Sequence, residues 1–484
     1  MLRITMSITQ QPRARGPGAT RFAIIGGGYT GAIIARHLAE RAHERIDQIL
    51  VFEPRTELGA GLAYSAPDPS LRLNVAAHRM RAVPGDPGAF AVWLKKTGRL
   101  SADVSAVTDS GIYARRSDFG DFMGELLRPH METGRILHVR EQVVSMERTS
   151  AGWTLFTKSG TPTVVDAVVI ATGHAPAKTP FQIPTHLMRT GQCVAAGDIG
   201  GLKRISTDET ILIVGSGLSA LDALSCLKSR NHRGPITILS RSGLLPRSHA
   251  RGDFSPYGDF TLEQPTAISV LRRFRDVVAE LTRDGVPWQS AMDALRHQGQ
   301  TLWMQMPQQE QRRVLRHLRR WYEVHRFRMP PQIEALLQTE VGDAPVTFLS
   351  GRLTKVGSHG DRIRVDLSRR ITKTAETLEV DRIIVATGPD QSNVLDYQPF
   401  LKNLADQGML RPDRLGLGID CDHLCRAISL RGNPQPSIVV AGPLTRGRFG
   451  EITGVPEIAS QASAIVDYLL RWSTQQTRTI EIGA

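Results

Sequence analysis

Short apolar runs alternate with helix-like stretches in two places along the chain, and the order of elements is the same in both. The first place has apolar runs at residues 22–25 and 49–52, separated by residues 32–45, whose apolar positions recur with helical spacing. The second has apolar runs at residues 211–214 and 236–239, again separated by a helical stretch. Continuous apolar strands that alternate with helices predict parallel sheets buried on both faces, and hence an α/β protein.

A glycine-rich loop joins the first strand to its helix. Gly26, Gly28 and Gly31 have the spacing GxGxxG, and the second apolar run ends at Glu53. In a dinucleotide site the first glycine allows a tight turn, the second lets a pyrophosphate approach the backbone, and the third lets helix and strand pack closely. The helix N-terminus offers N–H groups to the phosphates, and an acid placed like Glu53 can bind ribose. The combination predicts a Rossmann-like domain, against the alternative of a simple glycine turn.

The second strand–helix–strand unit has a related loop with a different ending. Gly215, Gly217 and Ala220 give GxGxxA, a permitted form of the same fingerprint. The strand that follows leads into Ser240 and Arg241, where a ribose-binding acid would stand. A carboxylate would repel a 2′-phosphate, whereas a guanidinium can bind one, so the loop favours NADPH over NADH. The alternative is that Arg241 is only a solvated loop residue.

A longer repeat indicates that a whole domain is duplicated. Residues 136–173 and residues 346–388 both run from an apolar strand through a short β-meander to a last strand. Both last strands end in Ala-Thr-Gly, at residues 171–173 and 386–388. Self-similarity on this scale indicates two copies of one domain, and the ends of parallel strands are where such domains bind ligands.

The repeated glycine loops, the ribose acid, the meanders and the Ala-Thr-Gly ends resemble the two-dinucleotide-binding-domain flavoproteins over residues 21–470. The resemblance implies two Rossmann-like domains, with FAD in the first and NAD(P)H in the second, which is inserted into the first. The expected divisions are a disordered tail (1–20), the first part of the FAD domain (21–205), the NAD(P)H domain (206–388) with a helical insertion (about 251–345), and the return to the FAD domain (389–484).

Shorter motifs narrow the resemblance. Residues 59–65, 73–75, 240–246 and 454–462 are similar to a bacterial FAD/NAD(P)-binding family. Its relatives include flavin hydroxylases of the urate-hydroxylase type and, at longer range, ornithine and lysine N-hydroxylases. The fingerprints of the N-hydroxylases and Baeyer–Villiger enzymes are not visible, so the resemblance does not fix the reaction. It does imply that a helix starting near Pro456 points its N-terminus at the flavin, where the helix dipole stabilises negative charge.

The motifs and the resemblance together give the expected cofactor contacts. The contacts expected for FAD are Gly26, Gly28, Tyr29, Thr30, Gly31, Glu53, Asn74, Val143, Thr172, Gly173, Gly442, Pro456 and Glu457. The contacts expected for NADPH are Gly215, Gly217, Leu218, Ser219, Ala220, Ser240, Arg241, Thr387 and Gly388.

Composition restricts the partners. The formal charge of +13 indicates anionic partners, which FAD and NADPH are, while the wide spread of the arginines argues against nucleic acid. The four cysteines form no CxxC pair, so the dithiol of many related flavoenzymes is absent in its usual spacing. The thiols are expected to be unpaired, in a reducing, cytoplasmic setting. No metal site is expected, and no apolar run is long enough to cross a membrane.

Candidate catalytic groups are few. The segment from residue 59 to about 122 is expected to form the other wall of the flavin site. Within it, Asn74 is a candidate contact of flavin or substrate, against the alternative of a turn-forming asparagine. His78, His174 and His249 are candidate acid–base groups, although most histidines of this kind are structural.

Residues 262–340 differ from both domains, because their apolar positions have helical spacing throughout. They are expected to form a helical insertion that can cap the active site. Its large apolar side chains are expected to form core in preference to a substrate pocket: Trp288, Trp303, Trp321, Tyr322, Phe327 and Met329. Its arginines are expected to lie mostly on a solvated face: Arg312, Arg313, Arg316, Arg319, Arg320, Arg326 and Arg328.

The expected chemistry is hydride transfer from NADPH to FAD, followed by reoxidation of the flavin. Without a CxxC dithiol, the leading acceptor is O2, which gives a C4a-peroxyflavin that hydroxylates a small-molecule substrate. Two alternatives stay open. One is a reductase that passes electrons to a quinone, a protein or a small acceptor, and the other is a non-catalytic protein that binds FAD or nucleotide.

Overall fold

The computed structural model describes residues 19–41, 46–177, 179, 181–339, 346–391 and 393–483, without the side chains of residues 477–483. The expected disordered tail falls almost entirely on residues 1–18, which lie outside the described residues. Thr20, assigned to that tail, already belongs to the first strand.

The first sheet has six strands in the order β17-β18-β9-β1-β2-β5. Five of them are parallel, and β17 pairs antiparallel with β18 at one edge. Their bounds are β1 Thr20–Ile25, β2 Ile46–Phe52, β5 Ile136–Val139, β9 Ala167–Ile170, β17 Arg426–Ile428 and β18 Pro434–Val440. The sheet therefore joins the N-terminal part of the chain to the return segment, as the resemblance implied.

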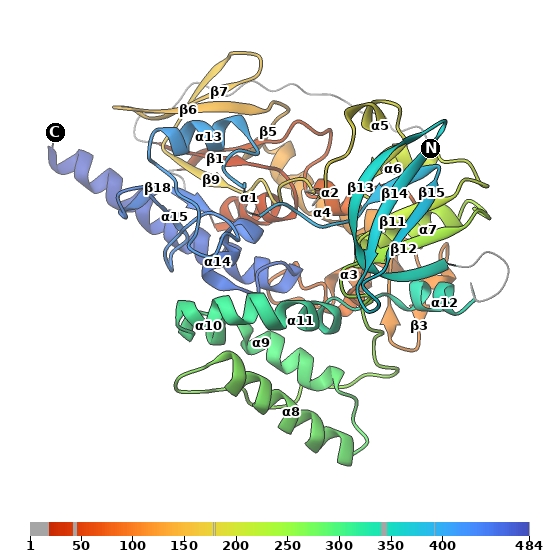
Figure 1. The fold of residues 1–484 in the computed structure, drawn as a ribbon. Helices are drawn as coiled ribbons and strands as arrows, with labels where there is room; N and C mark the ends of the chain where they lie inside the picture. Colours follow the sequence, from red (N-terminus) through yellow and green to blue (C-terminus); the bar gives the residue numbers. More distant parts are fainter. Residues whose placement is uncertain are drawn as a thin grey trace.

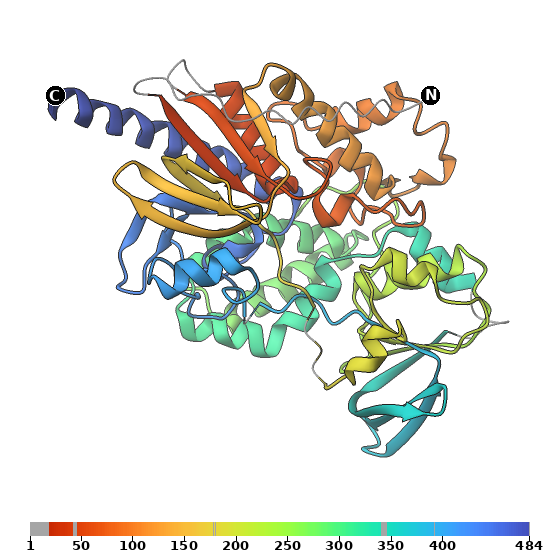
Figure 2. The same ribbon diagram turned by 90° about the horizontal axis from the view of Figure 1, so that it is seen from above.

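The second sheet has seven strands in the order β10-β16-β11-β12-β13-β14-β15. Their bounds are β10 Cys193–Ala195, β11 Ile211–Val214, β12 Ile236–Ser240, β13 Val346–His359, β14 Arg362–Arg369, β15 Ala375–Val380 and β16 Arg382–Val385. Since β10 pairs with β16, the chain crosses to this sheet between residues 170 and 193, before the expected boundary at residue 205. The six-stranded sheet and the elements packed on it form the first module, and the seven-stranded sheet and its elements form the second. The two sheets lie apart in Figure 2.

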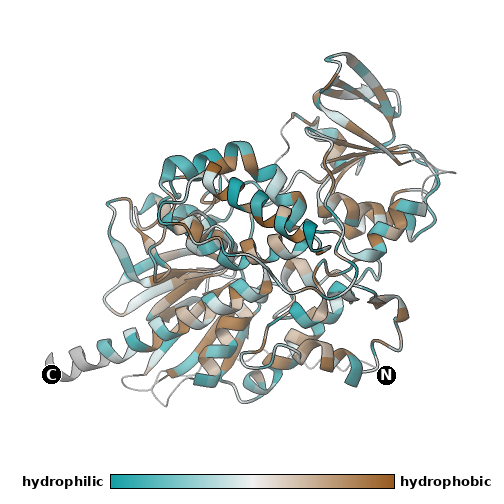
Figure 3. Cartoon of the chain, turned by 90° about the horizontal axis from the view of Figure 1, so that it is seen from below, coloured by the Kyte–Doolittle hydropathy of each residue, from teal (hydrophilic) through white to brown (hydrophobic). Residues whose placement is uncertain are grey.

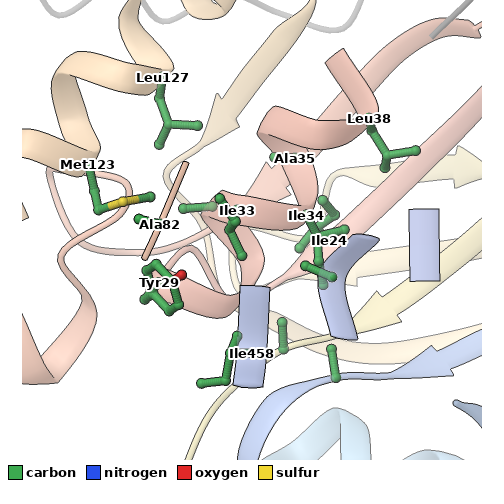
Figure 4. Packing of buried hydrophobic residues seen from close by; sticks show 14 of the residues in the cluster. Ile24, Tyr29, Ile33, Ile34, Ala35, Leu38, Ala82, Met123, Leu127 and Ile458 are labelled. Carbon is green, nitrogen blue, oxygen red and sulfur yellow. The ribbon is translucent and has the colours of Figure 1, made fainter. Parts of the chain in front are cut away.

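Helices cover one face of each sheet and an antiparallel meander covers the other. In the first module α1 (Tyr29–Arg41), α4 (Arg116–Glu132) and α15 (Val455–Gly483) share a buried apolar cluster with one face of the sheet. Figure 4 shows part of this cluster, with Ile24 of β1 among α1 side chains and Ile458 of α15. The other face packs on the meander β6 (Val143–Thr149), β7 (Gly152–Thr157) and β8 (Pro162–Val165), and on α13 (Pro399–Asp406).

The second module repeats this arrangement. One face packs on α6 (Ile199–Lys203), α7 (Leu218–Lys228) and α12 (Pro331–Thr339), and the other on the antiparallel strands β13 to β15. The expected strand and meander are continuous here, because residues 346–350 of β13 pair parallel with β12 and residues 351–359 pair antiparallel with β14.

The remaining elements of the two modules are short. They are α2 Gly61–Tyr64, α3 Ala89–Lys96, β3 Val107–Thr108, β4 Gly111–Ile112, α5 Thr185–Arg189, α14 Arg446–Phe449 and the 3-10 turns Ala77–Arg79, Val104–Ala106 and Gly442–Thr445. None of the described helices is long and apolar enough to cross a membrane.

The expected helical insertion is confirmed, and it packs on the first module. It consists of α8 Ala267–Arg283, α9 Gln289–Gln305, α10 Gln308–Arg313, a π-helical turn Val314–Leu318 and α11 Arg319–Arg326. Figure 1 shows these helices beneath α14 and α15. Ion pairs join Arg296 of α9 to Glu457 of α15, and Arg326 of α11 to Glu451. In Figure 3 the insertion helices carry hydrophilic stretches interrupted by hydrophobic ones, as helices with one buried face do.

Candidate active site

The loop between β1 and α1 leaves no room for a side chain at two of its glycines. Gly26 has φ +104°, and a Cβ on it would lie 2.5 Å from the carbonyl oxygen of Ala171. A Cβ on Gly31 would lie 1.9 Å from the carbonyl oxygen of Gly26. A Cβ on Gly28, by contrast, would have only the Cα of Gly61 near it, at 3.4 Å. The backbone of Gly28 is therefore free of side chains, as close approach of a pyrophosphate requires.

The second module has the same geometry at Gly215. Its φ is +119°, and a Cβ would lie 2.1 Å from the carbonyl oxygen of Ala386. The amides of Ala171 and Ala386 are fixed alike, since each donates to the last carbonyl of the neighbouring strand, Ile25 or Val214, at 2.8 Å. The first glycine of each loop thus rests on the alanine of an Ala-Thr-Gly end, which explains why the two motifs are repeated together.

Glu53, expected at the ribose, is buried at the end of β2. Its carboxylate accepts hydrogen bonds from the amide of Gly27 at 3.0 Å and from the amide of Arg55 at 3.1 Å. A carboxylate has about four acceptor positions, so capacity remains for a ribose hydroxyl. The ribose contact itself stays a prediction.

The return segment closes against the start of α1. Gly442 has φ +66°, and a Cβ on it would lie 2.7 Å from Oγ1 of Thr30. Its amide donates to Oε1 of Gln461 at 2.7 Å, and Nε2 of Gln461 donates to Oγ1 of Thr445 at 2.9 Å. This role of Gln461 could not be predicted from the sequence, because only the fold brings α15 to this loop.

The N-termini of α1 and α15 meet. The hydroxyl of Tyr29 donates to the carbonyl oxygen of Val455 at 3.2 Å. Both helices can therefore direct N–H groups and positive dipole ends towards one anionic ligand. The carboxylate of Glu457 is held by two hydrogen bonds from Arg296, at 2.7 and 2.9 Å.

Two further features of the first module fit FAD. The hydroxyl of Thr172 is buried and has no hydrogen-bond partner among the described residues. A Cβ on Gly173 would meet no atom within 4 Å, so the end of β9 is open to a ligand. Val143 is buried in the core of the first module, and it could meet the cofactor only through its backbone.

The corresponding positions of the second module are also open. No atom lies within 4 Å of a Cβ on Gly217 or Gly388. Ser219 and Arg241 are exposed, and Oγ of Ser240 accepts the amide of Gly243 at 3.0 Å. Leu218 and Ala220 pack into apolar clusters instead. An exposed guanidinium at the end of β12 fits the 2′-phosphate of NADPH.

A small polar pocket lies where the loop after residue 74, the loop after His249 and the start of α9 meet. Asp293 of α9 forms ion pairs with Arg79, at 2.6 Å, and with Arg328. Although burial raises the pKa of the Asp293 carboxyl, Arg328 and Arg79 outweigh it and hold that pKa below its usual value. Nε2 of His249 lies 3.1 Å from the carbonyl oxygen of Asn74. The structure thus brings together two of the residues predicted from the sequence.

Three buried polar atoms of this pocket have no hydrogen-bond partner in the part of the chain that the structure describes: Oε1 of Gln289, Oγ of Ser290 and Nε of Arg328. The pocket has a volume of about 30 Å³, enough for a water molecule or the polar end of a ligand. Gln289, Ser290 and Asp293 could not be predicted from the sequence, because nothing in a helical pattern shows which polar residues will face another module.

Comparisons with known proteins agree with this geometry. A family model described as FAD-NAD(P)-binding matches residues 23–175. L-lysine 6-monooxygenase from Pseudomonas syringae is similar in structure, with 18% identity over 93% of this chain and 99% of that one and a TM-score of 0.62. The ornithine N-hydroxylase of Kutzneria sp. 744 covers 94% and 99% at 16% identity, with a TM-score of 0.62. The chain has the two-dinucleotide-binding-domain flavoprotein fold.

The same fold also occurs in proteins with different electron acceptors. Thioredoxin reductase from Lactococcus lactis covers 94% of this chain and 99% of its own at 12% identity, with a TM-score of 0.51. No curated protein sequence matches the chain. At these identities the likeness establishes the fold, and the site must decide the reaction.

The four cysteine thiols of the protein are inaccessible to solvent. All four cysteines are free and buried. Burial raises the pKa of the Cys193 thiol to about 11 and those of Cys226 and Cys425 to about 12. Burial also raises the pKa of Cys421 well above its usual value. Since the thiolate is the reactive form, none of these groups is suited to exchange with a disulfide.

Two candidate histidines do not reach the polar pocket. His78 and His174 are both exposed, and neither lines the pocket. His78 accepts a hydrogen bond from Nε of the neighbouring Arg79 at 3.3 Å. The structure therefore gives neither residue an assigned partner for proton transfer, in contrast to His249.

The insertion corrects one expectation and agrees with another. Its aromatic residues are not simply core, because Trp303, Trp321 and Tyr322 line a cavity. Its arginines are mostly exposed, as expected, but Arg326 and Arg328 are buried in ion pairs with carboxylates. Helical spacing alone could not distinguish the buried arginines from the exposed ones, since the carboxylates that pair with Arg326 and Arg328 come from α9 and from the loop before α15.

Proposed function

We propose that the protein is an NADPH-dependent FAD monooxygenase that uses O2 to hydroxylate a small molecule. The polar pocket beside Asn74 carries the proposal. Its three buried polar atoms without a partner in the described residues cost free energy unless a ligand or water satisfies them. The polar end of a bound substrate, with donor and acceptor atoms, would satisfy them.

The thiols favour this reaction over disulfide reduction. Members of the fold that reduce disulfides need an accessible dithiol, whereas every cysteine here is buried and has a raised pKa. The similar structures named as lysine and ornithine hydroxylases show that the fold supports hydroxylation in other proteins. The free thiols also support a reducing, cytoplasmic setting.

The two loops have separate roles in the proposal. When bound, FAD would take electrons from NADPH and pass them to O2. The amides after Gly28 and the N-terminus of α1 would bind its pyrophosphate, and Glu53 its ribose. Arg241 would bind the 2′-phosphate of NADPH. The N-terminus of α15 would stabilise negative charge on the reduced cofactor.

His249 would orient the substrate in the polar pocket as a neutral hydrogen-bond acceptor. Burial lowers its pKa to about 3, so the ring is neutral at physiological pH. Because the carbonyl oxygen of Asn74 can only accept, Nε2 of His249 carries the proton and Nδ1 is the acceptor. Nδ1 can then accept a hydrogen bond from the substrate and orient it, while the ring itself stays neutral. Arg328, Ser290 and Gln289 would hold the polar groups of the substrate in place.

The test is an anaerobic titration of the purified protein with NADPH, followed by readmission of air. We expect a yellow protein whose flavin absorbance is bleached by NADPH at lower concentrations than by NADH. With a substrate present, NADPH oxidation should consume O2 in a one-to-one ratio and yield a hydroxylated product.

Two results would count against the proposal. Reduced protein that passes electrons to quinones or dyes as fast as to O2, and hydroxylates nothing, is a reductase. Yellow protein that NADPH never bleaches, even when polar amines and amino acids are supplied, is a binding protein.

A further inference from the structure

A mostly apolar cavity of about 510 Å³ lies between the helices of the insertion and the return segment near Arg446 and Glu451. Val270 and Phe274 of α8, Leu295 and Leu302 of α9, and Leu318 and Trp321 beyond them are among its walls. Sites for organic ligands have volumes of about 300–1,000 Å³ and mostly apolar walls. The cavity therefore has the size and character of a ligand site.

The cavity is separate from the polar pocket, because α9 stands between them. Leu295 and Leu302 face the cavity, whereas Asp293 and Arg296 point to the other side. On that side Asp293 pairs with Arg79, and Arg296 with Glu457. Residues on opposite faces of one helix thus contact two different sites.

The charged groups of the cavity favour an anion. Arg275, Arg319 and Arg446 line it. Arg319 and Arg446 share the single carboxylate of Glu323, at 2.8 and 3.4 Å. Arg275 is exposed and forms no ion pair among the described residues. Set against these three guanidiniums, Glu323 beside the cavity and Glu451 in its wall still leave a net positive charge.

The single acid that lines the cavity is already engaged. Glu451 accepts hydrogen bonds from Arg326 at 2.7 Å and from the hydroxyl of Tyr322 at 2.7 Å. Arg326 and Arg296 hold the pKa of the Glu451 carboxyl below its usual value against the effect of burial. The charge of Glu451 is therefore already balanced by Arg326, and the remaining positive charge of the cavity selects against a cationic ligand.

The apolar walls also need an occupant. An apolar space of this size forfeits dispersion contacts along its lining unless something fills it. Part of the wall is the π-helical turn Val314–Leu318, of which Val314, Leu315 and Leu318 line the cavity. Single π-helical turns within helices are frequent at functional sites.

We propose that this cavity binds an amphiphilic carboxylate, with its apolar chain between α8, α9 and the π-helical turn and its carboxylate at Arg275. The site goes beyond the proposed oxidation, because its occupant does not reach the polar pocket on the far side of α9. Binding here does not depend on NADPH or on turnover.

The test is calorimetric titration of the FAD-loaded protein with decanoate. Decanol serves as the uncharged analogue of equal chain length. We expect decanoate to bind at least about tenfold more tightly than decanol, since a charge-assisted hydrogen bond contributes about one such factor or more. The variant Arg275→Gln should lose most of that preference and leave decanol binding unchanged.

Two further variants supply the controls. Arg272→Gln changes an exposed arginine of α8 that does not line the cavity, and it should bind decanoate like the unaltered protein. Gly299→Leu places a side chain in the cavity from α9, where a Cβ would have only Glu451 near it, at 3.7 Å. It should abolish binding of both ligands while FAD absorbance and melting temperature persist.

Three outcomes would overturn the inference: no heat from decanoate, equal losses in Arg275→Gln and Arg272→Gln, or undiminished binding in Gly299→Leu. Should Gly299→Leu fail to fold, Leu271→Phe fills the same space from α8. None of these outcomes depends on the monooxygenase reaction, so the two proposals can fail separately.

Discussion

At the scale of single residues, the polar pocket confines several charged side chains in a small space. Asp293 pairs with both Arg79 and Arg328, and the imidazole of His249 stays neutral. Its ring lies 5.0 Å from that of Tyr113, and its bond to the carbonyl oxygen of Asn74 fixes which nitrogen carries the proton. Protonation of His249 would place a third cation beside the two arginines and is therefore unfavourable in the folded protein.

The pH dependence of stability should report this neutral histidine. The pKa of His249 in the folded protein is about 3, against about 6.5 in an unfolded chain. Between those values only the unfolded chain binds the proton, so the stability contribution is complete above pH 6.5 and is lost as the pH falls towards 3. In thermal melts across this range, His249→Gln should show a flatter dependence on pH than the unaltered protein. Parallel curves would show that His249 is protonated in the folded state.

At the scale of elements, the two glycines of the second loop have different tasks. A side chain at Gly215 would strike the backbone of Ala386 at 2.1 Å with φ +119°, whereas Gly217 has φ −80° and open space. The first glycine therefore serves the fold, and the second serves the ligand.

A pair of variants separates these tasks. Gly217→Val should keep the melting temperature and the bound FAD, but should raise the NADPH concentration for half-maximal flavin reduction by about tenfold or more, a loss of about 1.4 kcal/mol. Gly215→Ala should instead destabilise the protein by more than about 1 kcal/mol in urea unfolding. Reversed effects, or unaltered NADPH dependence in Gly217→Val, would contradict the assignment of the second loop.

The limits of prediction from sequence also lie at this scale. The glycine loops, Glu53 and the Ala-Thr-Gly ends were recognisable because each task is set within a few residues of one strand end. Gln289, Ser290 and Asp293 were not, since α9 meets the loop after Asn74 only through tertiary packing. The buried Arg328 and the unbroken β13 were missed for the same reason, as burial and strand partners are properties of the assembled molecule.

At the scale of the whole molecule, the second module meets the first through α7 as well as through the insertion. Arg116 of α4 pairs with Asp222 of α7 at 2.7 Å, and the thiol of Cys226 donates to Asp68 at 3.3 Å. The insertion, in turn, holds the start of α15 through Glu451 and Glu457. Whatever orders the start of α15 should therefore also order α9 and α11.

Removal of FAD tests this coupling. A bound ligand stabilises the state that binds it, by about 2.7 kcal/mol at a hundredfold excess over Kd, and the proposed FAD contacts include Gly442, Tyr29 and the N-terminus of α15. Without FAD, amide hydrogen exchange measured by mass spectrometry should rise in residues 442–458 and, through the Arg296–Glu457 and Arg326–Glu451 pairs, in α9 and α11. Strands β13 to β15, which belong to the second sheet, should exchange alike with and without FAD and serve as the internal control.

Two outcomes would contradict this coupling. Uniformly faster exchange across both modules would mean that FAD stabilises the molecule only globally. Faster exchange confined to residues 442–458 would mean that the ion pairs do not transmit the order of α15 to the insertion.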